Sequence, residues 1–228
     1  MTTVIGFDFD DTLVRSPYGR LFYRPWLRAQ EQAAGVEAGT FARVISEAGN
    51  RLWFQGRWAE SFDWAAICHR ELGLVLPDPV PPDPATVRPL VVDGAVELMA
   101  SLLHQGYRLA LITNGLWRFQ APYLAALGWD QVFSMILTPD RTGTAKPDPR
   151  MFWPVPALTW FVGDRPFHDV LGAYRAGVRS VLLGDGPLEE HRPDPLGRVT
   201  PPDRTVKSLR ELAEAPWPRA SWTRPATP

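Results

Sequence analysis

Two patterns of apolar residues divide the chain. Short apolar runs that end at polar residues or glycine are typical of buried strands. Longer segments, with apolar residues at helical spacing, separate these runs. The short runs predict strands over residues 4–9, 107–112, 132–137, 159–162 and 180–183.

Helices are predicted between and after these strands. Asp93 is expected to cap a helix that runs to about Gln105. Further helices are predicted over residues 120–127, 169–176 and 206–213. Strand and helix in turn indicate a parallel sheet with helices on both faces. The fold class is therefore α/β, with a Rossmann-like three-layer α/β/α core.

Residues 15–88 break this alternation. The pattern there predicts only helices, over residues 25–34, 40–53 (with Thr40 as N-cap) and 61–72. A proline-rich stretch at about residues 76–88 is too rich in proline for a central strand and predicts a stiff linker. We expect a small all-helical cap domain of residues 15–88, inserted into an α/β core domain of residues 1–14 and 89–215. Residues 216–228 are expected to form a flexible, proline-rich tail.

Polar residues gather where strands of the predicted sheet end. Asp8 and Asp10 follow the first strand, and similar groups stand at residues 113–115, 146–147 and 163–169. The carboxyl ends of parallel strands meet at one edge of a sheet, where ligands bind. Adjacent acids there repel one another and lose water, so they should share a cation or a proton.

These residues, in this order, resemble the motifs of the haloacid dehalogenase-like hydrolase superfamily. Asp8-Phe9-Asp10-Asp11-Thr12 resembles the first motif of the family. Thr113-Asn114, which follows an apolar strand, resembles the second motif. Lys146-Pro147-Asp148-Pro149 resembles the third motif, and the segment from Gly163 to Asp169 resembles the fourth. The helical insert is similar to the smaller helical cap of that family. The resemblance covers about residues 3–214.

The resemblance implies a Mg²⁺-dependent phosphatase with catalytic residues Asp8, Asp10 and Lys146. Asp8 would be the nucleophile that forms an acyl phosphate. The side chain of Asp10 would be the general acid and base, which argues against carbon–halogen cleavage because halide leaves without a proton. Lys146 would neutralise charge on the nucleophile and the transferring phosphoryl group.

The same resemblance implies the binding residues. Thr113, Asn114, Gly115 and Lys146 would bind the phosphate group of the substrate. The Mg²⁺ ligands would be Asp8, Asp164 and the main-chain carbonyl of Asp10, with Asp169 as an outer support. Asp169 is equally suited to cap its helix, and both interpretations stay open.

Other polar and aromatic residues have simpler interpretations. Asp11 is expected in a turn, His168 at a helix start without a catalytic task, and Cys68 in the core. The tryptophans of the insert, Trp53, Trp58 and Trp64, are expected to pack rather than stack on substrate. Trp117 and Arg118 follow the predicted phosphate turn, Thr113-Asn114-Gly115, and are expected to line the entrance of the site.

The segment between Lys146 and Asp164 departs from the family pattern. Pro154 and Pro156 allow no more than about one helical turn there. We expect an exposed patch on the sheet at this place, covered by tryptophans, a partner subunit or the tail.

Composition limits the classes of binding partner and the cell compartment that we expect. The 228 residues carry a formal net charge of −1, which gives no reason to expect nucleic acid or a membrane surface as partner. The single cysteine excludes an internal disulfide, and with no signal peptide in view this favours the cytoplasm. Only Lys146 and Lys207 are lysines, so a lysine at a motif position stands out.

The sequence therefore predicts a Mg²⁺-dependent phosphatase that acts on a small phosphorylated metabolite, as a monomer or homodimer. Two alternatives stay open. One is a phosphomutase or phosphotransferase with the same aspartyl chemistry, and the other is a non-catalytic binding protein that kept the fold.

Overall fold

The computed structural model describes residues 2–186, 200–214 and 217. Its core is a six-stranded sheet in which every neighbouring pair is parallel and the strand order is β3-β2-β1-β4-β5-β6. The strands are β1 (Val4–Phe7), β2 (Arg108–Ile112), β3 (Met135–Leu137), β4 (Leu158–Gly163), β5 (Arg179–Leu183) and β6 (Arg204–Val206). The predicted parallel α/β fold is confirmed, and β1 lies in the interior of the sheet between β2 and β4.

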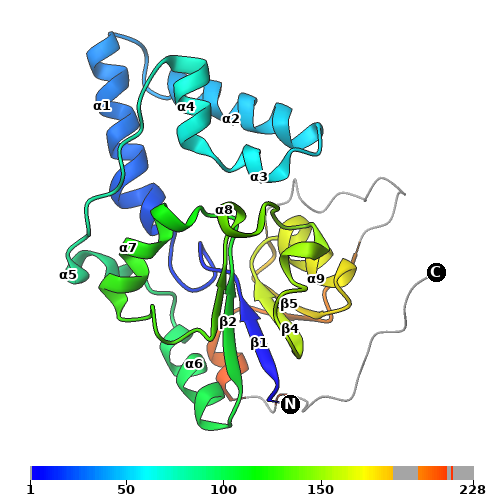
Figure 1. The fold of residues 1–228 in the computed structure, drawn as a ribbon. Helices are drawn as coiled ribbons and strands as arrows, with labels where there is room; N and C mark the ends of the chain where they lie inside the picture. Colours follow the sequence, from blue (N-terminus) through cyan, green and yellow to red (C-terminus); the bar gives the residue numbers. More distant parts are fainter. Residues whose placement is uncertain (1, 187–199, 215–216, 218–228) are drawn as a thin grey trace.

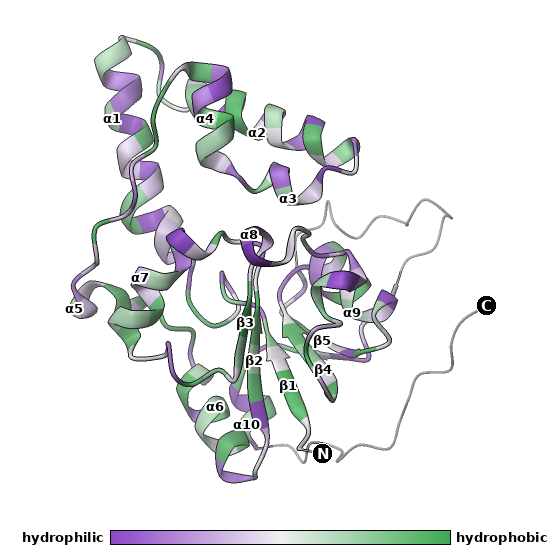
Figure 2. Ribbon diagram, viewed as in Figure 1, coloured by the Kyte–Doolittle hydropathy of each residue, from purple (hydrophilic) through white to green (hydrophobic). Residues whose placement is uncertain are grey.

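Successive residues of a strand point to opposite faces, and this alternation divides the core. Ile5, Leu109 and Leu111 belong to one buried cluster, together with residues of the helices on that face. Val4 and Ala110 belong to a second buried cluster on the opposite face. Strands that are apolar on both faces must be covered on both, which agrees with the green colour of the sheet in Figure 2.

Helices cover both faces of the sheet (Figure 1). Helices α6 (Ala95–His104) and α10 (Arg210–Ala213) pack together on one side, near α7 (Trp117–Leu127). Helix α9 (Leu171–Arg175) packs on β5 from the other side. Short helical turns complete the core at Arg88–Leu90, Pro139–Thr142 (α8), Pro149–Met151 and Pro166–Val170.

The helical insert lies beyond the carboxyl ends of the strands (Figure 1). After a π-helical turn at Gly19–Tyr23 it contains α1 (Arg24–Ala34), α2 (Thr40–Phe54), α3 (Trp58–Ser61) and α4 (Trp64–Leu72). The returning chain is extended until α5 (Pro84–Val87), a single turn that begins at Pro84 and is capped by the Asp83 side chain. The insert therefore stands over the edge of the sheet where the sequence places its polar motifs.

Three helix boundaries in the structure differ from the prediction. Helix α2 begins at Thr40, but Gly39 is its N-cap, and the Glu31 carboxylate accepts the main-chain N–H groups of Gly39 and Phe41. The helix predicted over residues 61–72 begins only at Trp64, because the Asp63 carboxylate accepts the N–H of Ala66 and starts α4, and the short α3 that ends at Ser61 was not predicted. Helix α6 has Gly94 as N-cap, while Asp93 pairs with Arg210.

The C-terminal prediction was wrong in two places. The helix predicted over residues 206–213 is the edge strand β6 followed by the short α10. Trp217, placed by the sequence in the flexible tail, is buried: its indole N–H donates to the Leu212 carbonyl and its own carbonyl accepts the Tyr107 hydroxyl. The other tail residues, 216 and 218–228, lie outside the described part of the chain.

The predicted exposed patch between Lys146 and Asp164 was also wrong. The shortened segment covers the sheet itself, because Met151, Phe152 and Val155 are buried in the second cluster. The Phe152 ring meets Phe161 of β4 edge-on, with 5.0 Å between ring centroids. A single turn can replace a helix here because one large aromatic side chain fills the space against the sheet.

Candidate active site

Three neighbouring strands end in predicted site residues. Because β1 lies between β2 and β4, Thr113, Asp8 and Asp164 follow adjacent strands at one edge of the sheet. The sheet fixes their main chain, since the N–H of Asp8 donates to the Val162 carbonyl at 2.9 Å. The topology thus brings together residues that are more than one hundred positions apart.

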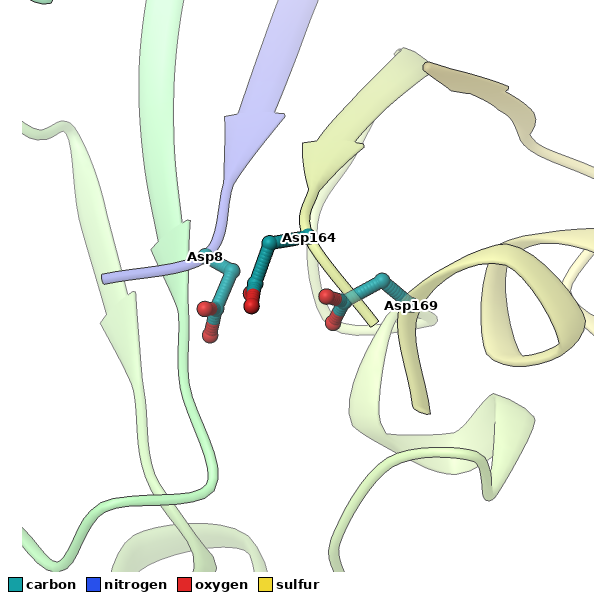
Figure 3. Close-up of side chains that lie close together, drawn as sticks. All are labelled: Asp8, Asp164 and Asp169. Carbon is teal, nitrogen blue, oxygen red and sulfur yellow. The ribbon is translucent and has the colours of Figure 1, made fainter. Parts of the chain in front are cut away.

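An acidic cluster lies at this edge (Figure 3). Carboxylate oxygens of Asp8, Asp164 and Asp169 all lie within 4.8 Å of one another. The Thr12 hydroxyl lies 3.3 Å from an Asp8 oxygen and 3.2 Å from an Asp164 oxygen, so it bridges two members of the cluster. Thr12 is part of the first motif, and the motif alone did not predict this contact.

Lys146 contacts two acids of this cluster. Its ammonium nitrogen lies 2.6 Å from an Asp8 oxygen and 2.6 Å from an Asp169 oxygen, and the residue is 1% exposed. The Asn114 side chain positions it: the amide oxygen accepts the Lys146 N–H and the amide nitrogen donates to the Lys146 carbonyl. The Asn114 side chain therefore positions Lys146, and the predicted phosphate contact of Asn114 stays a prediction.

Asp169 has two tasks in the structure. One carboxylate oxygen receives the Lys146 ammonium, and the other accepts the main-chain N–H of Arg165 at 2.9 Å. Gly163 makes this position possible, because a Cβ there would lie 2.2 Å from the Asp169 carboxylate. The predicted capping position is wrong, because Asp169 lies inside the turn Pro166–Val170, whose N-cap is Arg165, and its role as an outer support of a metal site stays a prediction.

Asp10 stands apart from Lys146 and contacts a neutral group. One of its oxygens accepts a hydrogen bond of 2.6 Å from the Gln120 side-chain amide. Burial, with the nearby charge of Asp8, raises the pKa of Asp10 to about 7. This carboxyl can therefore hold or release a proton near neutral pH, as a general acid and base must. Gln120 was missed, since its contact spans 110 positions.

The electrostatics of the acidic cluster favour a bound cation. Burial, with repulsion from Asp169 and Asp8, raises the pKa of Asp164 to about 8. Burial also raises the pKa of Asp8 to about 6, although Lys146 opposes the rise. Burial disfavours the Lys146 charge, but the two carboxylates outweigh it and raise its pKa. One lysine does not compensate these acids, and a set of hard carboxylate oxygens fits Mg²⁺.

A cavity of about 290 Å³ contains the site. The predicted site residues all line it: Asp8, Asp10, Thr113, Asn114, Gly115, Lys146, Asp164 and Asp169. The Thr113 hydroxyl accepts the N–H of Gly115 at 3.1 Å, so this turn is held by its own side chain. Aromatic and basic residues of the insert also line the cavity, among them Phe62, Trp64 and Arg24.

Some expectations about the surroundings need correction. The residues that line the cavity after the phosphate turn are Leu116, Phe119 and Gln120, not Trp117 and Arg118. The Trp117 ring lies under the Arg141 guanidinium, while Arg118 lies 3.8 Å from both Asp63 and Asp78. Arg118 therefore faces the insert and its linker, whereas Trp117 packs against α8.

His168 connects the insert to the site. Its ring lies 4.7 Å from that of Trp53 and 5.7 Å from that of Phe62, while Nδ1 lies 3.3 Å from the Lys146 carbonyl. Burial lowers the pKa of His168 to about 4, so the imidazole is neutral at neutral pH.

The fold is a parallel, Rossmann-like α/β core with a lysine–carboxylate centre at the carboxyl edge of its sheet. Residues 2–177 match the family model of haloacid dehalogenase-like hydrolases, and residues 143–212 match a second model of the same kind. The chain belongs to the haloacid dehalogenase-like hydrolase family.

Named relatives and solved structures agree with this assignment. The chain is 38% identical over 218 residues to a phosphoglycolate phosphatase of Pseudomonas fluorescens, covering 83% of this chain and 74% of the relative. It is 38% identical over 130 residues to a phosphoserine phosphatase of Thermus thermophilus, covering 53% and 50%. A HAD phosphatase structure from Thermococcus onnurineus matches with a TM-score of 0.62 and 22% identity, over 93% of this chain and 96% of that one.

These similarities have limits. The chain spans about half the length of several curated relatives that it matches. Dehalogenases are also among the similar solved structures, at 22% identity or less, which shows the fold alone. In the part of the chain that the structure describes, no helix combines the length and apolar character required to cross a membrane.

Proposed function

We propose that this chain is a Mg²⁺-dependent phosphatase that hydrolyses a small phosphorylated metabolite through an aspartyl-phosphate on Asp8. One observation carries the proposal: the two carboxyls of the first motif, the buried Asp8 and the half-buried Asp10, lie in opposite environments. Asp8 is paired with the Lys146 ammonium, whereas Asp10 is hydrogen-bonded to the neutral Gln120 amide. Such a pair separates the tasks of nucleophile and general acid.

In the first half-reaction a carboxylate oxygen of Asp8 attacks the phosphorus atom. The new Asp8 O–P bond forms as the ester P–O bond breaks, and the proton of Asp10 passes to the leaving oxygen. Lys146 stabilises negative charge next to the attacking oxygen, and the Thr113 hydroxyl stands at the same edge to bind phosphate oxygens.

In the second half-reaction water attacks the phosphorus atom and the Asp8 O–P bond breaks. Asp10, now a carboxylate, takes a proton from the water and returns to its starting state. Inorganic phosphate leaves, and Asp8 is again a carboxylate. The cycle consumes one water and one ester and needs no other reactant.

Asp8, Asp164 and the main-chain carbonyl of Asp10 would hold Mg²⁺, with Asp169 in support. The ion, when bound, would screen the repulsion between the Asp8 carboxylate and the dianionic phosphate and polarise the phosphoryl group. The residue geometry supports the carboxylate part of this donor set, since oxygens of Asp8, Asp164 and Asp169 converge.

The helical insert would act as a cap domain over the core of residues 1–14 and 89–215. Support comes from Phe62 and Trp64, which line the site cavity, and from Trp53, which packs on His168. Enclosure by these side chains would exclude water during the first half-reaction and admit it for the second.

Two further observations support a phosphatase over its alternatives. Both relatives described above carry phosphatase names. A dehalogenase has no need of Asp10, because a halide leaves without a proton, yet this half-buried carboxyl is held in place by a hydrogen bond. Hydrolysis rather than transfer to a second hydroxyl is proposed because water suffices to complete the cycle.

Asp8→Asn tests the proposal. With 4-nitrophenyl phosphate and Mg²⁺, the wild-type chain should release phosphate and the variant should not, because an amide oxygen is a poor nucleophile. Thermal unfolding should stay cooperative in the variant. Asp130→Asn, an exposed acid far from the site motifs, should match the wild type. Full activity of Asp8→Asn contradicts the proposal, and ester consumption without phosphate release would indicate a transferase.

A further inference from the structure

Gln120 is a buried amide that contacts a proposed catalytic carboxyl. It lies in the first turns of α7, is 2% exposed, and its side-chain nitrogen donates to an Asp10 oxygen at 2.6 Å. It also lines the site cavity. Neither the sequence motifs nor the similarities to other proteins give this residue a role.

The fold makes room for this contact at Gly115. A Cβ at residue 115 would lie 1.8 Å from the Gln120 amide nitrogen and 2.7 Å from its amide carbon. Any other residue at position 115 would therefore push the amide off its present path. The glycine of the phosphate turn is explained here by the space that Gln120 occupies.

Stability alone does not explain a glutamine at this position. Among the described residues, the Gln120 amide oxygen is buried and has no hydrogen-bond partner. A buried acceptor without a partner destabilises the fold because it loses its hydrogen bonds to water, and an apolar side chain of the same size would avoid that loss. What the amide adds is its hydrogen bond to Asp10.

We propose that Gln120 is a positioning residue that aims the Asp10 carboxyl at the leaving oxygen of the substrate. A neutral amide suits this task, because it orients one carboxyl oxygen without fixing the charge of the group. A lysine or arginine in its place would hold Asp10 as a carboxylate and oppose the proton transfer. This inference rests on the proposed function, in which Asp10 gives its proton to the ester oxygen as the P–O bond breaks.

Gln120→Met, which keeps the length of the side chain and removes the amide, tests the proposal with two esters. The kcat/KM value reports the steps up to the first bond cleavage. An alkyl phosphate has a strongly basic leaving oxygen that needs the proton of Asp10, whereas 4-nitrophenolate leaves with little help. General acid catalysis contributes about 10²–10⁴-fold, so a misaligned acid should lower kcat/KM for the alkyl ester by about tenfold. For 4-nitrophenyl phosphate kcat/KM should change much less.

The Asp10→Asn variant provides the second arm. With no acid left to aim, adding Gln120→Met should cause no further loss of kcat/KM, whereas independent effects would multiply. Gln131→Met, at an exposed glutamine whose side chain reaches only Asp130 among the hydrogen bonds described, is the matched control and should match the wild type for both esters. Thermal unfolding of each variant reports whether the fold is kept.

The outcomes separate this inference from the proposed function. Equal losses for both esters, no loss for either, or a loss that persists undiminished in the Asp10→Asn background would each overturn the positioning role. Wild-type chain that releases phosphate from neither ester would overturn the proposed function and the inference together.

Discussion

Lys146 links the two sides of the acidic cluster. Its ammonium contacts Asp8, after β1, and Asp169, in the turn before α9, while Asn114, after β2, holds its main chain. A buried ammonium with two carboxylate partners is compensated, but its removal leaves two carboxylates that face one another away from water. Loss of one partner from a buried charge pair is strongly destabilising for this reason.

Lys146→Met should therefore lose both activity and stability. We expect kcat for phosphate release to fall by at least about 10²-fold, the usual effect of removing one preorganised charge-stabilising group. In the absence of Mg²⁺, urea unfolding should show a loss of about 3–5 kcal/mol. Lys207→Met, at the exposed second lysine, should change neither quantity. Wild-type stability in Lys146→Met would show that the buried pair contributes nothing to the fold.

The sequence predicted the site residues whose place follows from strand ends. Asp8, Thr113 and Asp164 each follow an apolar run, and parallel strands bring such positions to one edge. It did not predict Gln120 or the packing of His168 on Trp53. Those contacts depend on how a helix rotates against the sheet and how the insert folds over it, which local patterns do not encode.

Glu31 organises the start of α2 from a neighbouring helix. This carboxylate is 2% exposed and accepts N–H groups of Gly39 and Phe41 at 2.9 and 2.8 Å. These N–H groups lack partners within the helix, so an external acceptor takes the role of the cap that Thr40 was expected to play. The N–H donors, first that of Gly39, lower the pKa of Glu31 despite burial, with help from Arg28.

Glu31→Gln should destabilise the chain by about 1 kcal/mol at neutral pH, the usual size of a cap effect. Because the folded-state pKa of Glu31 lies below its usual 4.5, its carboxylate stabilises the fold above that pH, and this contribution is lost as pH falls through the folded-state pKa. The difference in unfolding free energy between wild type and variant should thus be constant above about pH 5 and shrink towards pH 3. Urea unfolding across this range measures it, and an unchanged difference at low pH would exclude the ionised carboxylate as its cause.

Errors at the level of helices and strands have physical causes. Asp63 was counted inside a helix, but its side chain caps α4, which begins only at Trp64. Residues 204–206 extend the sheet beside β5. Local sequence patterns do not predict this pairing, because the partner strand lies more than twenty residues earlier in the chain. The shortened segment after Lys146 looked unable to cover the sheet, yet Phe152 does so with one side chain.

The whole molecule places charge and enclosure at the same edge. Six parallel strands, with β1 in the interior, collect the acids at the end of the sheet that faces the insert (Figure 1). The insert adds Phe62, Trp64 and Arg24 to the cavity wall, so a substrate would be held between core and insert. The small phosphate ester proposed as substrate is compatible in size with a cavity of about 290 Å³.

We expect the stability of the folded chain to depend on a divalent ion bound by the acids at this edge. Asp8 and Asp164 have raised pKa values because they are buried near one another and near Asp169, and a bound cation would relieve that repulsion. Because the unfolded chain cannot assemble these oxygens, Mg²⁺ should bind the folded state selectively. At one hundred times its dissociation constant it should add about 2.7 kcal/mol.

For a chain of this length that gain corresponds to a rise in Tm of about 5–10 °C, measurable by thermal unfolding with Mg²⁺ and with EDTA. Asp164→Asn should raise the Tm in EDTA, since one repelling acid is gone, and should lose most of the Mg²⁺-dependent rise. Asp130→Asn should keep that rise in full, because its carboxylate is exposed and distant from the cluster. An Asp164→Asn chain stabilised by Mg²⁺ as much as the wild type would mean that the ion binds elsewhere, and the proposed ligand set would then be wrong.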